Sequence, residues 1–267
     1  MNIQAEQLRA FCQRVLEKVD VPAEHAVLIA TVLVETDLRG VTSHGTSLLP
    51  RYVRRFQTGL TNPRPRMQII GQRGATALVD GDTGLGHVVS HFAMERAIGL
   101  ARAHAMGMVA VRNSTHFGMA GYYAMMAARE GMIGYATSNA GADMAPWQGR
   151  EPALGNNPIA YAIPAGEYPD IVLDMACSVA AAGRIRVAQL KGEQIPRGWV
   201  VGDHTDPAAA MKAPLMPFGA HKGSGLAVVG EILSAVLPGA VLGIEVAHTQ
   251  PVGGERRDPR GIGHCFM

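Results

Sequence analysis

Two histidines stand in sequence contexts that suit proton transfer. His44, in the segment TDLRGVTSHG, lies where the pattern predicts the start of a helix with Ser43 as its cap, and a helix N-terminus lowers the pKa of an imidazole. His116, in RNSTHFG, follows a predicted strand and has small or polar neighbours. Reduction of a carbonyl needs a proton donor at the oxygen while hydride reaches the carbon, and histidine fits that task. One histidine suffices, so the structural alternative for each is local bonding at a helix start or in a loop.

A carboxylate and an ammonium group occupy two further positions that suit a ligand. Asp174 ends the apolar run DIVLDM, where it suits the orientation of a histidine or a hydrogen bond to a ribose hydroxyl; a strand-end cap is its structural alternative. Lys222, in HKGSG, precedes a predicted helix, so its ammonium group and the following amides suit a phosphate or carboxylate, with a solvated lysine as the alternative. Turn formation alone explains Asn157 in GNNP.

Several common motifs are missing from the sequence. The nearest match to GxGxxG, at Gly223 and Gly225, lacks the third glycine and follows no strand pattern, so a standard Rossmann domain is not supported. The Walker, HExxH and GxSxG patterns are missing as well, which removes the main support for an ATPase, a metalloprotease or a serine esterase. The 3 cysteines lie far apart without a CxxC pair, so neither a disulfide framework nor a metal site is expected.

The positions of these residues depend on an alternation of helix and strand patterns, which predicts an α/β protein. Helices are predicted over residues 3–19, from Pro22 to Leu38 and from Ser43 to Gly59, and they form a helical N-terminal segment, 1–62. The second part, 63–267, is a predicted sheet domain. Its strand patterns are MQIIG, ATALVDG, GMVAVRN, MIGYATS, NPIAYAIP and DIVLDMA, the first two as a hairpin, and its helices follow residue 87, pass through Arg184 and follow Gly223.

The composition is typical of a folded globular chain. Of the 267 residues, 48% are hydrophobic and 17% are charged, which leaves ample apolar material for a core. The 24 basic and 22 acidic side chains form no long basic run, so nucleic acid is not an expected partner. The N-terminus has no secretion-signal pattern, and the most apolar stretch contains Glu231, so no membrane span is expected. The cytoplasm is the expected location.

The segments that carry these residues occur in a characteristic order. They are TDLRGVTSHG, RNSTHFGMAGYYA, GNNPIAYAIP, DMACS, IPRGW and PFGAHKGSGL. In order and spacing they closely resemble the type 2 malate/L-lactate dehydrogenase family, which also includes ureidoglycolate, sulfolactate and diketogulonate enzymes and a cyclic-imine reductase. So many motifs in order make the resemblance far more specific than a single glycine pattern.

The resemblance implies a non-Rossmann NAD(P)-binding fold, with a mixed sheet flanked by helices, in a homodimer. It implies an oxidoreductase that moves hydride between NAD(P) and a small 2-hydroxy or 2-oxo acid, with NAD as the expected cofactor and NADP as the alternative. His44 or His116 is then the acid/base group, and Asp174 is the third expected catalytic residue. The implied cofactor contacts are Ala140, Asp174, Met175, Ala176, Lys222 and Gly223.

The sequence departs from the family pattern at three places. Leu48 stands where an arginine that suits a substrate carboxylate is common, so Arg51, one helical turn later, is the expected substitute beside Ser43, with a surface position as its alternative. Ala140 replaces a serine of some relatives but keeps its backbone amide. The chain stops at GIGHCFM, which resembles an internal strand of the family, so a missing C-terminal portion and an exposed apolar surface are expected.

Two alternatives stand beside the hydroxy acid dehydrogenase. The first is a cyclic-imine (C=N) reductase of the same family, which uses the same hydride geometry. The second is a truncated, non-catalytic relative, which the early C-terminus and Leu48 favour and which the intact SHG, THFG and HKG motifs oppose. A ligand that binds only the folded state raises its stability, so a thermal-shift titration with cofactor separates this last alternative from an enzyme.

Overall fold

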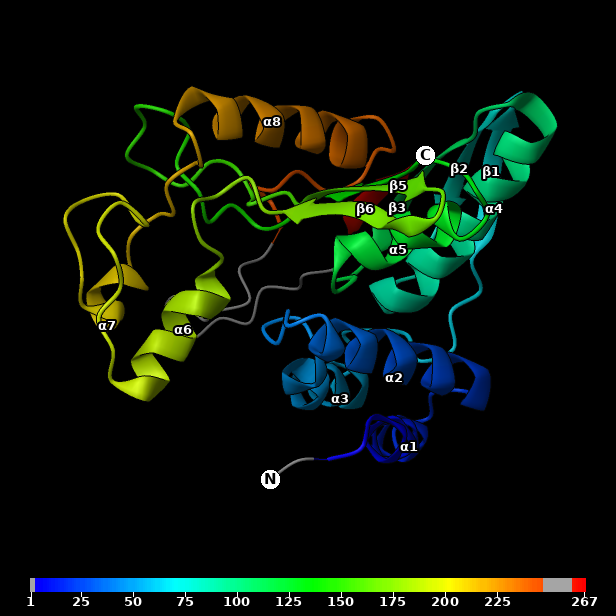
Figure 1. The fold of residues 1–267 in the computed structure, drawn as a ribbon, viewed down its shortest axis with the longest axis horizontal. Helices are drawn as coiled ribbons and strands as arrows, with labels where there is room; N and C mark the ends of the chain where they lie inside the picture. The colour runs from blue at the N-terminus through cyan, green and yellow to red at the C-terminus, as the bar shows by residue number, and fades with distance from the viewer. Residues whose placement is uncertain (1–2, 247–260) are drawn as a thin grey trace.

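The computed structural model of the chain describes residues 3–246 and 261–267 and has an α/β architecture (Figure 1). The helices are α1 (Ala5–Glu17), α2 (Ala23–Leu38), a 3-10 turn (Thr46–Leu48), α3 (Leu49–Gln57), α4 (Gly86–His104), α5 (Ala120–Ala128), α6 (Ala182–Lys191), α7 (Pro207–Ala210), α8 (His221–Glu231) and a π-helical turn (Ile232–Val236). The strands are β1 (Gln68–Arg73), β2 (Thr76–Asp80), β3 (Met108–Ser114), β4 (Gly134–Ser138), β5 (Ile159–Ala165), β6 (Tyr168–Met175) and β7 (Ile262–Phe266). Each strand pattern found in the sequence corresponds to an observed strand.

One 7-stranded sheet has the order β1-β2-β3-β7-β4-β5-β6, which confirms the expected mixed α/β fold. Only β2 and β3 are parallel, and the other neighbouring pairs are antiparallel. β7 lies between β3 and β4, where Val111 faces His264 and Thr137 faces Cys265. Every residue of β7 is buried, so this strand forms the centre of the sheet.

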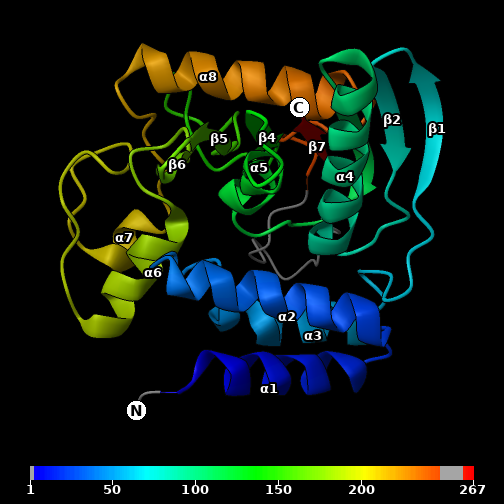
Figure 2. The same cartoon turned by 45° about the vertical axis from the view of Figure 1, so that its right-hand side comes forward.

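Helices cover both faces of the sheet. α5 lies on the side that faces α2, whereas α8 crosses the opposite side (Figures 1 and 2). The sequence of α5, AGYYAMMAA, is apolar around nearly the whole helix, and almost all of its residues are buried. Tyr123 of this helix is fully buried between Phe117 and Phe266, with ring centroids 5.3 and 5.7 Å away. The main core therefore lies between α5 and the central strands.

The three N-terminal helices pack as a layer with an apolar core of its own. Leu33 of α2 and Tyr52 of α3 are fully buried there, and Leu85 and Val88 at the start of α4 complete the same cluster. The layer is thus joined to the sheet through α4, and a domain boundary at residue 62 remains a prediction. Within the described ranges, none of the helices is both long and apolar enough to cross a membrane.

The prediction that the third helix begins at Ser43 is wrong. The chain forms a 3-10 turn before α3, which begins only at Leu49. The Asp37 carboxylate accepts hydrogen bonds from the amide and the hydroxyl of Thr46, whereas the Ser43 hydroxyl bonds to His44 and caps no helix. His44 therefore lies in a turn ahead of the helix, and a helix N-terminus does not set its pKa.

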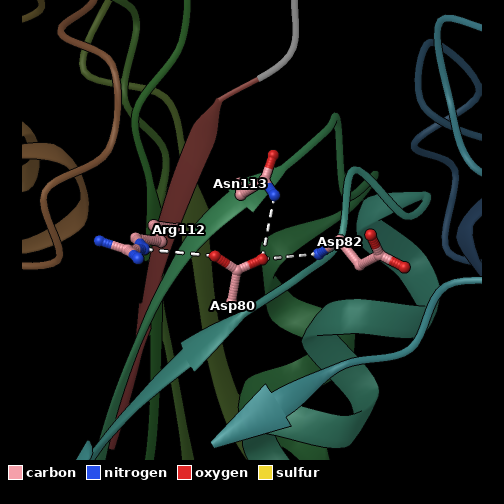
Figure 3. A network of polar contacts seen from close by, with 4 residues as sticks. All are labelled: Asp80, Asp82, Arg112 and Asn113. Atoms are coloured by element: carbon pink, nitrogen blue, oxygen red, sulfur yellow. Dashed lines mark hydrogen bonds and ion pairs between the residues drawn. The ribbon is translucent and has the colours of Figure 1, made fainter. Parts of the chain in front are cut away.

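One carboxylate holds the ends of the parallel strands β2 and β3 together (Figure 3). Asp80 Oδ1 accepts hydrogen bonds from the Asn113 side chain at 2.9 Å and from the Asp82 amide at 3.0 Å, and its Oδ2 lies 3.3 Å from Nε of Arg112. Burial raises the pKa of Asp80, but these three groups outweigh burial and leave the pKa below its ordinary value. The charged carboxylate thus anchors the end of β3, from which the loop with His116 continues.

A substitution of Gly134, at the start of β4, tests how closely α5 packs on the sheet. A Cβ there would lie 2.1 Å from the Ala124 carbonyl oxygen of α5. We expect Gly134→Ala to lower the free energy of unfolding by about 1–3 kcal/mol, because backbone atoms must move apart. Gly99→Ala, in the exposed middle of α4 with no atom within 4 Å, should raise it by about 0.5–1 kcal/mol. Urea denaturation measures both, and an unchanged Gly134→Ala protein would contradict this packing.

Candidate active site

His44 and His116 come together although they belong to different parts of the fold. His44 lies in the turn that follows α2, and His116 lies in the loop between β3 and α5. Their rings stack with 5.6 Å between centroids and 22° between planes. The two histidines found in the sequence therefore form one site, at the contact between the helical layer and the sheet.

Two donors fix the orientation and the tautomer of His116. The Tyr52 hydroxyl lies 2.7 Å from Nδ1, and the Gly118 amide donates to the same atom at 3.3 Å. Because a backbone amide can only donate, Nδ1 is an acceptor, and the proton of the neutral ring is on Nε2. The Tyr52 hydroxyl then donates to Nδ1 as well. His116 is thus an Nε2–H donor whose ring is held through hydrogen bonds at Nδ1.

The environment keeps both histidines uncharged. Burial lowers the pKa of His116 far below its ordinary value, and the neighbouring His44 and Arg51 lower it further. Burial and Arg51 also lower the pKa of His44. Each protonated ring would face the other ring and a guanidinium, so the site holds two neutral imidazoles at neutral pH.

Arg51 of α3 supplies the fixed positive charge of the site. It directly precedes Tyr52, whose hydroxyl bonds to His116, and its charge lowers the pKa of both His44 and His116. Ser43 adjoins the pair, since its Oγ lies 2.9 Å from His44 Nδ1. The start of α6 packs here too, because a Cβ at Gly183 would lie 3.1 Å from the Ser43 Cβ. Of the two expected substrate-binding residues, Ser43 thus contacts His44, and Arg51 is near enough for its charge to act on both histidines.

A third histidine holds the loop that carries His116. His264 of β7 is fully buried, and its two ring nitrogens lie 2.9 Å from the hydroxyls of Ser114 and Ser138. Its ring stacks on Phe117 with 4.7 Å between centroids and 8° between planes. Since Ser114 and Phe117 flank Thr115 and His116, β7 holds this segment at both ends.

Asp174, at the end of β6, does not orient either histidine through Nδ1. Its Oδ2 accepts a hydrogen bond from the Gly121 amide at 2.7 Å, while the Nδ1 atoms of the histidines have the other partners described above. Burial raises the pKa of its carboxyl, and the Gly121 amide and Arg39 partly offset that rise. The hydrogen bond to Gly121 gives Asp174 a structural role at the end of β6, and its expected contact with a ribose hydroxyl remains a prediction.

The expected cofactor contacts lie in one continuous region. Asn157 links two of them, because its Oδ1 accepts a hydrogen bond from the Ala140 amide at 3.0 Å and its carbonyl accepts one from the Cys177 thiol. Cys177 directly follows Asp174–Ala176. Its carbonyl oxygen would lie 2.6 Å from a Cβ at Gly223, so the first turn of α8 sits against the end of β6.

The chemistry of this region fits a nicotinamide dinucleotide. The Asp174 carboxylate suits ribose hydroxyls, and the Lys222 ammonium group at the start of α8 suits phosphates. The amides of Lys222 and Gly223 already donate to the carbonyls of Gly219 and Phe218, so the Lys222 ammonium group is what this helix start offers to a phosphate. Among the described residues, no group of three or more His, Cys, Asp or Glu side chains is arranged to hold a metal ion.

Sequence analysis did not find Tyr52 or His264 as site residues. Tyr52 appears in the sequence as an apolar position of a helix, and His264 as part of a short strand, so neither has a local signal. Their hydrogen-bond partners His116 and Ser114 lie 64 and 150 residues away along the chain. Only the fold reveals such contacts.

The sequence matches the family model described as malate/L-lactate dehydrogenase over residues 3–267. The chain belongs to this family. The resemblance drawn from the ordered motifs is thereby confirmed, and the match includes both the helical layer and the sheet.

Individual relatives agree in sequence and in fold. A malate dehydrogenase from Pyrococcus abyssi is 42% identical over 93% of this chain and 72% of its own length. The structure of a sulfolactate dehydrogenase from Methanocaldococcus jannaschii has a TM-score of 0.90 at 41% identity, covering 100% of this chain and 77% of that one. A Δ1-piperideine-2-carboxylate reductase from Pseudomonas syringae pvar. tomato has a TM-score of 0.90 at 25% identity, over 100% and 82%. The same fold thus occurs in proteins named as dehydrogenases and in one named as a reductase.

Because several histidines are buried, we expect the free energy of unfolding to fall as the pH is lowered. Burial lowers the pKa of His87 and His264 to about 3, and that of His116 well below its ordinary value. In the unfolded chain they protonate near pH 6.5, so below that pH the unfolded state binds more protons. We expect the free energy of unfolding to fall by about 1.4 kcal/mol per pH unit for each of them as the pH drops below about 6.

Urea denaturation at several pH values measures this slope, and His264→Asn is the matched variant. It removes one of the titrating rings, so its slope should be shallower than that of the parent. Asp143, whose pKa burial raises to about 7, acts in the opposite direction but is common to both proteins. Equal slopes for parent and variant would show that His264 is not neutral in the folded state.

Proposed function

We propose that the chain is a nicotinamide-dependent dehydrogenase that moves hydride between NAD(P) and a small 2-hydroxy or 2-oxo acid. The observation that carries this proposal is the neutral ring of His116, whose Nδ1 accepts hydrogen bonds from Tyr52 and Gly118 and whose Nε2 holds the proton. A neutral N–H donor beside the Arg51 guanidinium suits a 2-oxo acid, because one group meets the carbonyl oxygen and the other the carboxylate.

In the reduction direction the proton leaves from Nε2 of His116. When bound, the nicotinamide supplies the hydride that forms the new C–H bond, and the carbonyl electron pair moves to the oxygen. That oxygen takes the Nε2 proton while Tyr52 gives its phenolic proton to Nδ1, so the imidazole stays neutral instead of becoming an anion. Burial raises the pKa of Tyr52, and the charges of Arg51 and Arg55 offset only part of that rise, so the phenolate formed in this step takes a proton back from solvent before the next turnover. Oxidation of the hydroxy acid reverses these steps.

The substrate carboxylate is held on the side of His44. Arg51 provides the planar guanidinium that pairs with a carboxylate through two parallel hydrogen bonds, in place of the arginine that the family pattern has at Leu48. The Ser43 hydroxyl bonds to His44 and keeps that ring stacked on His116. His44 then contributes a neutral hydrogen-bonding group to the substrate side instead of a second positive charge.

The cofactor lies along the region from Ala140 to Lys222 in this proposal. Asp174 takes a ribose hydroxyl, the Lys222 ammonium group takes a phosphate, and the backbone at Ala140, Met175 and Gly223 lines the same path. We propose NAD ahead of NADP, since a carboxylate accepts hydrogen bonds from a free ribose hydroxyl and repels a phosphate in its place.

We also propose a homodimer that works in the cytoplasm without a nucleic-acid partner. The edge strand β6 exposes Tyr168, Ile171 and Leu173, an apolar surface that a second subunit would cover. The cysteines are buried and unpaired, which suits a reducing compartment. The 24 basic side chains exceed the 22 acidic ones by only two, so the chain has little net positive charge to attract nucleic acid.

A cyclic-imine reductase is the second candidate function, because a solved structure with that type of name shares the fold. Hydride then adds to the carbon of a C=N bond, and the proton goes to the nitrogen. The same Nε2–H donor on His116 serves this reaction, so the two candidates differ in the substrate and not in the arrangement of the site.

The deciding experiment follows the absorbance of reduced nicotinamide with a panel of 2-oxo acids and a cyclic imine. Oxidation of NADH or NADPH by a 2-oxo acid supports the proposal and identifies the substrate group and the cofactor. Turnover of the imine alone selects the second candidate. Absence of turnover, with no thermal shift on adding either cofactor, selects the non-catalytic alternative.

Removal of one hydroxyl tests the proton path. Tyr52→Phe keeps the ring but loses the donor to His116 Nδ1, so kcat should fall by about 10²-fold, while KM changes little because the hydroxyl lies behind the imidazole. Steady-state kinetics with the best 2-oxo acid provide the measurement. Tyr161→Phe, the same change at an exposed tyrosine of β5, is the control. A kcat within about twofold of the parent would exclude the Tyr52 step.

Removal of one guanidinium tests the substrate side. Arg51→Ala should raise KM for the 2-oxo acid by about 10–100-fold, since the variant loses hydrogen bonds to a charged carboxylate. The dissociation constant for NADH should stay nearly the same, because the cofactor region lies elsewhere. Arg54→Ala removes an exposed arginine from the same helix and serves as the control. An unchanged KM in Arg51→Ala would assign the carboxylate to another residue.

A further inference from the structure

His87 is a buried polar residue that the proton path described above does not use. It lies in the first turn of α4, is 0% exposed, and has no hydrogen-bond partner for either ring nitrogen within residues 3–246 and 261–267. Buried polar groups in folded proteins are nearly always paired, because an unpaired one costs stability. A histidine kept in such a place therefore calls for an explanation other than stability.

The contacts of His87 lead directly to the proton donor. Its ring meets the ring of Tyr52 edge to face, with 5.2 Å between centroids and 76° between planes. Its Nε2 faces the backbone of Gly118, where a Cβ would lie only 2.8 Å from that nitrogen. Tyr52 and Gly118 supply the two hydrogen bonds to Nδ1 of His116. Both groups that set the tautomer of His116 thus rest on the same buried ring.

We propose that His87 is a positioning residue for His116: its ring holds Tyr52 and Gly118 against Nδ1 of His116 and so keeps the His116 proton on Nε2, facing the substrate. The inference rests on the proposed function, because only that function gives the Nε2 proton a task. It goes beyond that function by naming the residue that maintains the donor form.

The shape and the charge of His87 both suit this role. Its five-membered ring ends at the Gly118 backbone, and the longer six-membered ring of phenylalanine would press on it. Gly118 has φ +79°, a conformation that glycine adopts most readily. In this conformation its amide donates to Nδ1 of His116, and the adjacent His87 ring limits how far the glycine backbone can move. Burial, and then His44, lower the pKa of His87 to about 3, so no charge arises behind His116.

Nitrogen-15 NMR of the histidine side chains tests the proposal directly. In the parent protein, Nδ1 of His116 should have the shift of an unprotonated nitrogen and Nε2 that of a protonated one, with the signals assigned through their loss in His116→Ala. In His87→Ala, Tyr52 and Gly118 lose their support, so the two shifts should move toward the average of both tautomers. An unchanged His116 spectrum in folded His87→Ala, or a parent protein with the proton on Nδ1, would overturn the proposal.

A pair of glycine variants tests the same contact with His87 intact. Gly118→Ala places a Cβ against His87 Nε2, whereas Gly131→Ala adds the same Cβ at a similar φ of +73° with no atom within 4 Å. Both variants carry the backbone strain of a left-handed alanine, but only Gly118→Ala should shift the His116 nitrogen signals and lower kcat by about tenfold. Equal effects of the two variants would assign the change to backbone strain and overturn the proposal.

The double variant His87→Ala/Gly118→Ala measures the coupling. The new Cβ fits the space that the imidazole leaves, so the combined loss of kcat should be smaller than the product of the two single losses. Strictly multiplicative losses would show that the residues act independently. If the parent oxidises no reduced cofactor with any 2-oxo acid or imine, the proposed function fails, whereas the NMR result for His87 is read without turnover.

Discussion

The hydrogen bond between the Tyr52 hydroxyl and Nδ1 of His116 joins the two layers of this protein at the place where chemistry is proposed. Tyr52 and His116 lie 64 residues apart, the first in the helical layer and the second in the loop that follows β3 of the sheet. The bond can form only if α3 is seated on α4, which the shared apolar cluster around Leu85 and Val88 achieves. The position of a proton donor is therefore a direct product of apolar packing between layers.

The histidines near this hydrogen bond are uncharged. The imidazoles of His44, His116, His87 and His264 are all shifted toward the neutral form, with burial as the largest cause in each. Burying a cation without a partner lowers the stability of the folded state. Neutral imidazoles around the proposed reacting position therefore destabilise the fold less than protonated ones would. Arg51 is then the charge that the proposed function directs at the substrate carboxylate, and the neighbouring imidazoles add no positive charge to it.

The sequence was a good guide to what depends on local pattern. Strand alternation and helical spacing located the elements of the sheet, and the ordered motifs identified the family and the pair His44 and His116. It was a poor guide where long-range contacts decide. The predicted start of the third helix was wrong because Asp37, from the preceding helix, binds Thr46 in a 3-10 turn, while the Ser43 hydroxyl bonds to His44. For Asp174 the sequence left open the orientation of a histidine, a ribose contact and a strand-end cap, and it did not indicate that the carboxylate accepts a hydrogen bond from the Gly121 amide. No spacing in the sequence indicates that Tyr52 meets His116.

The strand order has a consequence for how the protein assembles. β1, β2 and β3 come from one stretch of chain, β4, β5 and β6 come from the next, and β7 alone joins these two halves. Each half forms through contacts that are close in sequence, but the side-chain bonds of His264 in β7 close loops of 126 and 150 residues. Closing such loops is slow and entropically costly. We therefore expect the loop that carries His116 to gain its support from β7 late in folding, after each half of the sheet has formed from its own stretch of chain.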